Sequence, residues 1–400
     1  MQTIVIAGAG MAGLTTAEAL REAGFDGTIT LVGDEPHRPY ERPPLSKEVL
    51  TSQNSGKGVW LRTDDELAAL SLDLRLGVRA MALRPSDRAV ELSDGTSLVA
   101  DAVVVATGAR ARRPRTDLPG VHVLRTLDDA EALRADLLRY GRVAVVGAGF
   151  LGAEVAASAR ALGAEVTLLE AADTLLPRVV DPRISAVFAE LHRDHGVDLR
   201  LGVPVTSFAG THRVERIELA DGTSVAAPVV VAGIGVHPNT EWLSGSGVLL
   251  DPEVGGVSCD PYLATSIPHV YAVGDLAAWP HPRYGGRIRL EHWANAEEQA
   301  RLAAHNLLAG EGARRPYTPV PYFWSDQYGR KIQLLGQASP ADTVEIVHGS
   351  VADRKFVAFV GRQDRLVGVL GMRSTPRVMR YRPLLEEPTS WADALAAAQQ

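Results

Sequence analysis

The 400-residue sequence contains a single cysteine, Cys259. A structural disulfide within the chain and a redox mechanism that uses a pair of thiols are therefore both excluded. Aromatic residues make up only 6% of the chain, but 46% of it is hydrophobic and 22% is charged, which is the ordinary balance of a globular protein. No apolar run approaches the roughly 20 residues that a membrane-spanning helix needs. The formal net charge of −7 disfavours general binding of nucleic acid.

A chain of this length is too long for one ordinary core, so we expect two or three domains. The first apolar strand is expected from Thr3, which leaves no room for a signal peptide. We therefore expect a cytoplasmic protein that binds neither membrane nor nucleic acid. We also expect no metal site.

The same glycine pattern, G-x-G-x-x-G, occurs twice. It runs Gly8-Ala-Gly10-Met-Ala-Gly13 near the N-terminus and Gly147-Ala-Gly149-Phe-Leu-Gly152 in mid-chain. Each copy follows a short apolar strand and opens an Ala-rich helical stretch, which is the context that dinucleotide binding requires. The first glycine allows the tight turn, the second lets a pyrophosphate approach, and the third lets helix and strand pack closely. Two copies predict two bound dinucleotides and electron transfer between them.

An acidic residue for the adenosine ribose follows each copy. Glu170 ends the predicted strand 165–170, about 20 residues after the second glycine turn, where a carboxylate can accept both ribose hydroxyls. Ala171 and Ala172 come next, with no basic residue for a 2′-phosphate, so NADH is favoured over NADPH. In the first copy the candidate is Asp34 or Glu35, with a slight preference for Asp34.

A second internal similarity links residues 91–108 with residues 218–235. Each stretch predicts a hairpin that turns on Asp-Gly, followed by a buried strand and a glycine turn. The turns contain Thr107 and Gly108 in the first stretch and Gly235 in the second. Each dinucleotide domain therefore has its own terminal strand, with a turn where its nucleotide should lie.

The rest of the chain adds a strand near 270 that ends in Gly274-Asp275, and then a helix from Trp293 through His305. Past residue 314 the pattern changes to strands that alternate with Gly or Asp turns, and a short Ala-rich helix at 391–398 closes the chain. The fold class predicted is α/β, with two Rossmann-like dinucleotide-binding domains and a C-terminal α+β domain.

These residues carry a resemblance to a known family. The most specific segments are Arg38-Pro-Tyr-Glu-Arg42-Pro-Pro-Leu-Ser-Lys47, Leu124-Arg125-Thr126, Tyr271-Ala-Val-Gly274-Asp275, His292-Trp293-Ala-Asn-Ala and Pro321-Tyr-Phe-Trp324-Ser-Asp-Gln327. Across essentially all of its length the chain resembles the FAD-dependent, NADH-using ferredoxin reductases of bacterial oxygenase and cytochrome P450 systems. The resemblance implies a glutathione-reductase-like fold, with a split FAD domain at 1–108 and 236–313, an NAD domain at 109–235 and a C-terminal domain at 314–400.

The resemblance also implies roles for individual residues. Lys47 is placed beside the flavin N5, with Glu154 as its partner, and these two are the candidate catalytic residues. Arg42 and Arg125 are expected on the FAD pyrophosphate, Asp275 on the ribitol and Trp293 beside the flavin. Glu291 is expected to line the nicotinamide site, and Trp324 to lie near the edge where electrons leave. Further candidate cofactor contacts are Ala80, Thr107, Gly108 and Gly235.

The function implied is hydride transfer from NADH to FAD, then single-electron transfer to a [2Fe–2S] ferredoxin that serves an oxygenase or cytochrome P450. Thiol-dependent relatives need a cysteine next to the flavin, but the corresponding segment reads Pro43-Pro-Leu-Ser46-Lys47. The alternative that stays open is a redox-gated interaction protein that resembles apoptosis-inducing factor.

The charge distribution indicates where a ferredoxin docks. Residues 311–400 carry 12 Lys and Arg against 9 Asp and Glu, whereas residues 1–310 carry 29 against 39. Small ferredoxins are usually acidic, and a basic patch steers such a partner. We expect the dock at Arg314-Arg315, Arg330-Lys331 and the run from Arg373 to Arg382.

Overall fold

The computed structural model describes residues 1–52, 58–176 and 181–399. These residues fall into two compact units, each assembled from three stretches of chain. The first unit contains Met1–Glu41, Gly58–Arg110 and His237–Pro319, and the second contains Arg42–Lys57, Ala111–Val236 and Val320–Gln400. The three-domain division expected from the sequence stays a proposal; it assigns 42–57 to the FAD domain, whereas these residues cluster with the second unit.

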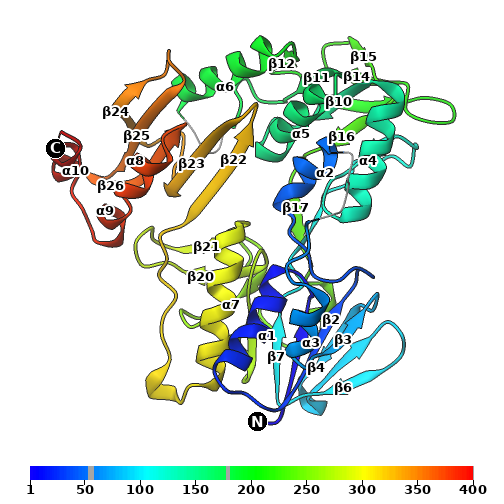
Figure 1. Ribbon diagram of the computed structural model, residues 1–400, viewed down its shortest axis with the longest axis vertical. Helices are drawn as coiled ribbons and strands as arrows, with labels where there is room; N and C mark the ends of the chain where they lie inside the picture. Colours follow the sequence, from blue (N-terminus) through cyan, green and yellow to red (C-terminus); the bar gives the residue numbers. More distant parts are fainter. Residues whose placement is uncertain (53–57, 177–180, 400) are drawn as a thin grey trace. The chain divides into compact units, whose positions relative to one another are not determined.

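The core of the first unit is a parallel sheet with strand order β19-β7-β1-β2-β3 (Figure 1). Its strands are β1 (Thr3–Ala7), β2 (Thr28–Gly33), β3 (Asp73–Leu76), β7 (Ala102–Val105) and β19 (Val270–Ala272). Helices α1 (Met11–Glu22) and α7 (Trp293–Leu308) lie side by side against it. The central strands are almost wholly buried, as expected for a parallel sheet covered by helices.

Smaller elements complete the first unit. An antiparallel sheet contains β4 (Ala80–Arg84), β5 (Ala89–Leu92) and β6 (Ser97–Val99), and another sheet contains β18 (Val257–Ser258), β20 (Ala277–Pro280) and β21 (Arg287–Arg289). Helix α3 (Asp64–Ala69) begins with a capping box between Thr63 and Glu66. Strands β8 (Ala109–Ala111) and β17 (Val236–Pro238) lie where the chain passes from one unit to the other.

The second unit contains another parallel sheet, with strand order β12-β11-β10-β16-β9. Its strands are β9 (Val121–His122), β10 (Arg142–Val146), β11 (Glu165–Leu169), β12 (Asp198–Arg200) and β16 (Val230–Ala232). The helices beside it are α2 (Glu48–Thr51), α4 (Leu127–Tyr140), α5 (Phe150–Ala161) and α6 (Pro182–Asp194). Between β12 and β16 the chain forms a separate three-stranded sheet of β13 (Val205–Ala209), β14 (Arg216–Leu219) and β15 (Ser224–Ala226).

The hairpins predicted from the internal similarity are confirmed in both units. Asp94 accepts hydrogen bonds from the backbone N–H and the hydroxyl of Thr96, at 2.9 and 2.7 Å. Asp221 accepts the same pair of bonds from Thr223, also at 2.9 and 2.7 Å. In both turns these bonds lower the pKa of the aspartate. The three-stranded antiparallel sheets β4-β5-β6 and β13-β14-β15 therefore contain the same type of hairpin turn.

The second unit also holds a five-stranded antiparallel sheet with order β22-β23-β26-β25-β24. Its strands are β22 (Tyr322–Gln327), β23 (Arg330–Gly336), β24 (Thr343–Ser350), β25 (Lys355–Arg362) and β26 (Arg365–Met372). Helices α8 (Thr375–Arg380), α9 (Pro383–Glu386) and α10 (Trp391–Ala398) pack on one face of it (Figure 1). Two parallel dinucleotide-type sheets and a C-terminal antiparallel sheet confirm the predicted fold class.

Candidate functional site

Both glycine turns have the geometry that the sequence pattern predicts. Gly8 has φ +122°, and a Cβ there would lie 2.1 Å from the Ala106 carbonyl oxygen. A Cβ at Gly13 would lie 1.8 Å from the Gly8 carbonyl oxygen, so only glycine allows α1 to approach β1 this closely. Around the Cβ position of Gly10, by contrast, no atom lies within 4 Å.

The second turn repeats the first one. Gly147 has φ +96° and faces the Gly233 carbonyl oxygen at 2.4 Å from its Cβ position, and a Cβ at Gly152 would lie 2.0 Å from the Gly147 carbonyl oxygen. Gly149 has open space at its Cβ position, as Gly10 does. In each turn, protein atoms therefore fill the space beside the first and third glycines, and the space beside the middle glycine is open.

The open glycines are also the N-caps of α1 and α5. Neither helix has a side-chain cap or an acidic residue in its first turn. The N–H groups of a first helical turn need acceptors, and the helix dipole favours an anion there. The residues present at both turns therefore fit a bound pyrophosphate.

Glu170 lies directly after β11, beside the second glycine turn. Its Oε2 accepts the Ala148 backbone N–H at 2.8 Å, and its Oε1 accepts the Ala172 N–H at 3.1 Å. The carboxylate is half-buried and is held in place from both sides. It lies where the sequence predicted the acid that reads the ribose.

The two acidic candidates of the first unit differ in their surroundings. Asp34 is exposed and forms an ion pair with Arg79 at 3.0 Å, whereas Glu35 is half-buried and accepts a hydrogen bond from the Tyr40 hydroxyl. Strand register matches Gly33 to Glu170, because Ala7 pairs with Val32 as Val146 pairs with Leu169. A Cβ at Gly33 would lie 2.7 Å from the Ala9 Cβ, which leaves no room for an acid at that position.

The Thr107-Gly108 turn forms hydrogen bonds with Asn239, which directly follows β17. The Thr107 hydroxyl donates to the Asn239 carbonyl oxygen at 2.8 Å, and the Asn239 amide donates back to the Thr107 carbonyl oxygen at 2.9 Å. Gly108 adopts φ +61° and accepts the Asn239 backbone N–H. Ala80 is buried at the start of β4, in the same unit.

The turn at Gly274-Asp275 lies next to the start of α7. The Gly274 N–H donates to Gln299 Oε1 at 2.7 Å. Arg289 donates to the Asp275 carbonyl oxygen at 2.7 Å and forms an ion pair with Glu291 at 2.8 Å. The structure therefore brings Asp275 and Glu291 together through Arg289. Trp293, half-buried, is the first residue of α7.

In the second unit, Lys47 and Glu154 form the predicted pair. Lys47 Nζ lies 2.6 Å from Glu154 Oε2, with side chains only 15% and 7% exposed. Lys47 also donates to the Pro43 carbonyl oxygen at 3.0 Å. The Ser46 and Ser325 hydroxyls donate to the two oxygens of Glu154, at 2.6 and 2.7 Å. These donors replace the water that a buried carboxylate loses.

The other predicted residues of the second unit lie as follows. Arg42 donates to the Arg125 carbonyl oxygen at 2.6 Å, so the two candidate pyrophosphate ligands lie together. Arg125 directly precedes α4, whose capping box joins Thr126 and Asp129. Gly235 has φ +97° and accepts the Arg112 backbone N–H. Trp324 stacks on Tyr322 with ring centroids 5.8 Å apart.

The single thiol of the chain is not reactive near neutral pH. Cys259 is buried, and burial raises the pKa of its thiol to about 12, so no thiolate forms near neutral pH. Within residues 1–52, 58–176 and 181–399, no group of three or more His, Cys, Asp or Glu side chains is arranged to hold a metal ion. In those same ranges no helix is long and apolar enough to span a bilayer.

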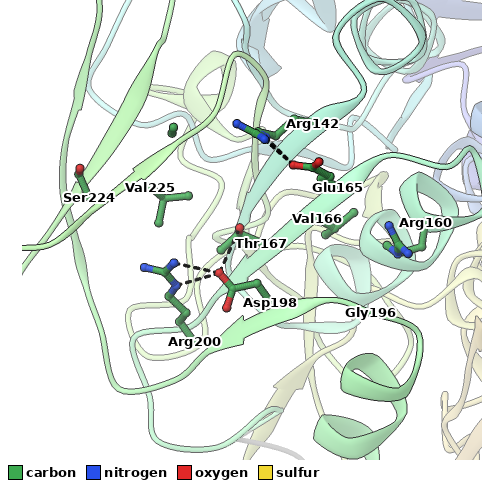
Figure 2. Close-up of a pocket in the computed structure, with 11 residues that line it drawn as sticks. Arg142, Arg160, Glu165, Val166, Thr167, Gly196, Asp198, Arg200, Ser224 and Val225 are labelled. Atoms are coloured by element: carbon green, nitrogen blue, oxygen red, sulfur yellow. Dashed lines mark hydrogen bonds and ion pairs between the residues drawn. The ribbon is translucent and has the colours of Figure 1, made fainter.

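A cavity of about 340 Å³ lies elsewhere in the second unit, over β10, β11 and β12 (Figure 2). Arg142, Glu165 and Asp198, which line it, are the first residues of those strands. The glycine turn and Glu170 follow the carboxyl ends of β10 and β11, where parallel sheets bind nucleotides. The cavity is therefore at the opposite edge from the predicted nucleotide site. Its arginines Arg142 and Arg200 are paired with Glu165 and Asp198.

The basic residues of the C-terminal region differ in whether they are neutralised. Arg354 pairs with Asp194 and Lys331 with Asp326. Among the described residues, Arg373, Arg377 and Arg380 are exposed and have no acidic partner, and the exposed Met379 lies between the last two. We call these three arginines and Met379 the α8 patch. Arg314 and Arg315 belong to the other unit.

Several residues around the predicted sites were not identified from the sequence. Ser46 and Ser325 hold Glu154, Arg289 links Asp275 to Glu291, and Gln299 fixes the Gly274 turn. Ser46 adjoins Lys47 and could have been noticed for that reason. Ser325 is 171 residues from Glu154, and no local pattern indicates such a contact.

The sequence matches two known families over nearly its whole length. Residues 2–300 match the pyridine nucleotide-disulphide oxidoreductase family, and residues 322–400 match the C-terminal domain of reductases. A curated relative is the ferredoxin–NAD(+) reductase component of the p-cumate 2,3-dioxygenase system of Pseudomonas putida. It is 42% identical over 372 residues, which cover 92% of this chain and 88% of the relative.

Solved structures agree with these matches. The ferredoxin reductase for the CYP199A2 system of Rhodopseudomonas palustris has a TM-score of 0.93 at 36% identity, with both chains covered completely. The reductase in the covalent putidaredoxin reductase–putidaredoxin complex has a TM-score of 0.91 at 34% identity, over 100% of this chain and 99% of the other. The chain therefore belongs to the pyridine nucleotide-disulphide oxidoreductase family, in the branch that carries the reductase C-terminal domain.

Proposed function

We propose that the protein is the FAD-dependent NADH:ferredoxin reductase of a bacterial oxygenase or cytochrome P450 system. The observation that carries this proposal is the pair of open glycine turns, each capping a helix that has no cap of its own, together with the buried Lys47–Glu154 pair. The family implies binding of FAD and NAD(P). The relative from Pseudomonas putida is named as a ferredoxin–NAD(+) reductase component.

The assignment of each nucleotide follows from the sequence order of the family. We assign FAD to the first glycine turn, with Asp34 or Glu35, Thr107, Gly108 and Asp275 as further ligands. NADH is assigned to the second turn, with Glu170 on its adenosine ribose. Bound FAD supplies the chemistry of accepting a hydride and releasing electrons one at a time.

The protein's own residues provide position and charge. Lys47 is only 15% exposed, and the Glu154 carboxylate lies 2.6 Å from its Nζ as the counter-charge. We propose that this pair faces the reacting rings. Arg42 and Arg125 bring two cations to the region of the pyrophosphate. None of these residues acts as a general acid or a nucleophile in hydride transfer.

For the electron acceptor we propose an acidic [2Fe–2S] ferredoxin that docks on the α8 patch. The three arginines there have no acidic partner in the described structure, and Met379 gives the patch an apolar contact. This combination fits an acidic partner with fast, salt-dependent association. Arg314 and Arg315 are a second, separate basic segment for the same partner.

Anaerobic mixing with NADH tests the proposed function. The purified protein should be yellow, NADH should bleach it, and added ferredoxin should restore the colour. A protein that binds flavin but passes no electrons to any [2Fe–2S] ferredoxin would instead support the interaction-protein alternative. A colourless protein that cannot be loaded with FAD would contradict both.

Charge reversal tests the docking surface. The double variant Arg377→Glu/Arg380→Glu should raise the KM for ferredoxin at least about tenfold at low salt and flatten its salt dependence. Bleaching by NADH should keep its rate. Arg314→Glu/Arg315→Glu tests the second segment, and Arg193→Glu, an exposed reversal on α6, is the control. Unchanged ferredoxin kinetics in both double variants would contradict the basic dock.

A further inference from the structure

The Glu154 carboxylate is held by groups from two distant segments. Oε2 accepts from Lys47 and Ser46, which precede α2, as described above. Oε1 accepts from the Ser325 hydroxyl on β22 at 2.7 Å and from the Asp326 backbone N–H at 3.4 Å. Ser325 is fully buried, so its hydroxyl cannot donate to solvent and donates to Glu154 instead. The C-terminal sheet thus supplies half of the donors to the carboxylate.

The hydrogen bonds continue inward from Ser325. Gln327, two residues further along the same face of β22, donates its Nε2 to Ser325 Oγ at 3.2 Å. Gln327 Oε1 and His192 Nε2 are both buried, and neither has a hydrogen-bond partner among the described residues. The two side chains interact electrostatically, because Gln327 favours the protonated form of His192. Gln327 therefore lies between Ser325 and His192 of α6.

His192 takes a defined tautomer in this arrangement. Burial lowers its pKa to about 4, so the ring is neutral near pH 7. Its Nδ1 lies 2.8 Å from the Tyr328 hydroxyl, and burial raises the pKa of Tyr328. The phenol keeps its proton and donates a hydrogen bond to Nδ1, which places the ring proton on Nε2.

The backbone at Tyr328 indicates that this side chain is required. Tyr328 and Gly329 form the two-residue turn between β22 and β23, with φ values of +51° and +69°. Such turns favour Asn or Gly, because a bulky residue in the left-handed region is strained. His195 stacks on the Tyr328 ring at 3.9 Å between centroids and an interplanar angle of 20°. A tyrosine in the left-handed region, stacked on His195 and in edge contact with His192, is typical of a position with a functional demand.

We propose that Ser325, Gln327, His192 and Tyr328 are positioning residues, a chain of hydrogen-bond donors that holds the Glu154 carboxylate against Lys47, in which His192 Nε2 donates to the otherwise unpartnered Gln327 Oε1. Aligned donors polarise one another, so the chain stabilises the anion more than its single bonds would. The role of this chain in the reaction rests on the proposed function, in which the Lys47–Glu154 pair serves the flavin. The chain itself is a property of the protein and is measurable without turnover.

The test is the rate at which a small acylating reagent modifies Lys47 in the native protein as purified, measured by mass spectrometry. Lys355, which is exposed on β25, is the internal reference. Ser325→Ala removes one donor to the buried anion and should speed the modification of Lys47 at least about fivefold. Ser325→Thr keeps the hydroxyl and should restore the wild-type rate. Tyr328→Phe, at the far end, should give a smaller increase of about twofold.

Ser185→Ala is the matched control, because the Ser185 hydroxyl is equally buried in the same unit and donates to the Leu175 carbonyl oxygen at 2.8 Å. It should leave Lys47 unchanged. If folded Ser325→Ala and Tyr328→Phe both label at the wild-type rate, the chain is overturned. If Ser325→Ala fails to fold, the rates of Lys47 modification in Tyr328→Phe and Ser185→Ala are compared. Equal rates in these two variants would overturn the chain, and a faster rate in Tyr328→Phe would support it.

A second measurement separates this inference from the proposed function. In the flavin-loaded protein, Ser325→Ala should slow bleaching by saturating NADH about fivefold and leave the Kd for NADH unchanged. If the wild type is not bleached by NADH, the proposed function fails while the labelling result still decides the chain. If the wild type is bleached and Ser325→Ala changes neither labelling nor bleaching, only the chain fails.

Discussion

Glu170 lies at the strand end where the sequence placed it, and its role on the ribose stays a prediction. Its distance from the glycine turn in sequence indicated the position, and the Ala148 and Ala172 N–H groups hold it there. Asp34 shows the limit of the same argument. Spacing alone favoured it slightly, but packing of Ala9 against Gly33 shifts the acidic residues of the first unit by one or two positions. The choice between Asp34 and Glu35 depends on side-chain contacts that spacing does not encode.

The first prediction concerns cofactor preference. A 2′-phosphate next to Glu170 would meet a like charge with no basic residue to compensate it. NADH should exceed NADPH in kcat/KM at least about tenfold, which is ~1.4 kcal/mol. Glu170→Ala should narrow this ratio, mainly by weakening NADH.

The control for this variant is Glu165→Ala, which removes an exposed carboxylate at the other end of β11. That change should leave the ratio as in the wild type. Equal efficiencies for NADH and NADPH in the wild-type protein would refute the role of Glu170.

The second prediction concerns the buried ion pair. Glu154→Gln leaves Lys47, only 15% exposed, without its counter-charge and should lower the free energy of unfolding by about 3 kcal/mol. Adding Lys47→Met to this variant should recover part of the loss, because the uncompensated charge is then gone. Urea unfolding followed by tryptophan fluorescence measures both. Additive losses in the double variant would show that the two residues are not coupled.

At the scale of elements, regular patterns were predicted and long-range contacts were not. Helix α10 spans 391–398, as expected, and both Asp-Gly hairpins have the predicted turns. These features are local, because they depend on turn residues and periodicity within about 20 residues of chain. The hydrogen bond from Ser325 of β22 to Glu154 joins residues far apart in sequence. No sequence pattern distinguishes Ser325 from any other serine in a strand.

The third prediction uses the contrast within the second glycine turn. Gly149→Ala adds a methyl group in open space at φ −68°, so it should leave the stability within about 0.5 kcal/mol of the wild type. The same methyl group faces the proposed pyrophosphate, so the Kd for NADH should rise at least tenfold, equivalent to ~1.4 kcal/mol.

Gly152→Ala is the opposite case, because its Cβ would lie 2.0 Å from the Gly147 carbonyl oxygen. This change should lower the free energy of unfolding by more than about 2 kcal/mol. Calorimetry and NADH titration distinguish the two variants. If Gly149→Ala bound NADH as tightly as the wild type, the nucleotide would not lie on this turn.

At the scale of the whole molecule, acid lability should be set first by buried histidines. Burial lowers the pKa of His192, His281 and His292 to about 4 from an ordinary value of 6.5. The unfolded chain takes up these protons at about pH 6.5 and the folded chain only near pH 4. The stability contributed by the neutral rings is therefore complete above pH 6.5 and is lost as the pH falls toward 4.

The fourth prediction follows from this window. The free energy of unfolding should fall between pH 6.5 and 4, with each histidine contributing a slope of up to ~1.4 kcal/mol per pH unit. Urea unfolding at several pH values measures the slope. His281→Gln should reduce this slope by the contribution of one histidine, up to ~1.4 kcal/mol per pH unit. His281 suits this test because it is 1% exposed and lies outside the proposed sites. A stability that stays constant from pH 6.5 to 5 would contradict the assignment of neutral buried rings.

In the function proposed above, the chain converts one hydride from NADH into two separate electrons for an iron–sulfur partner. The most direct measurement is an anaerobic titration with limiting NADH, catalytic amounts of the protein and an excess of oxidised [2Fe–2S] ferredoxin. Two ferredoxins should be reduced for each NADH consumed, and none with the flavin-free protein. NADH consumption with no reduced ferredoxin would contradict the proposed function.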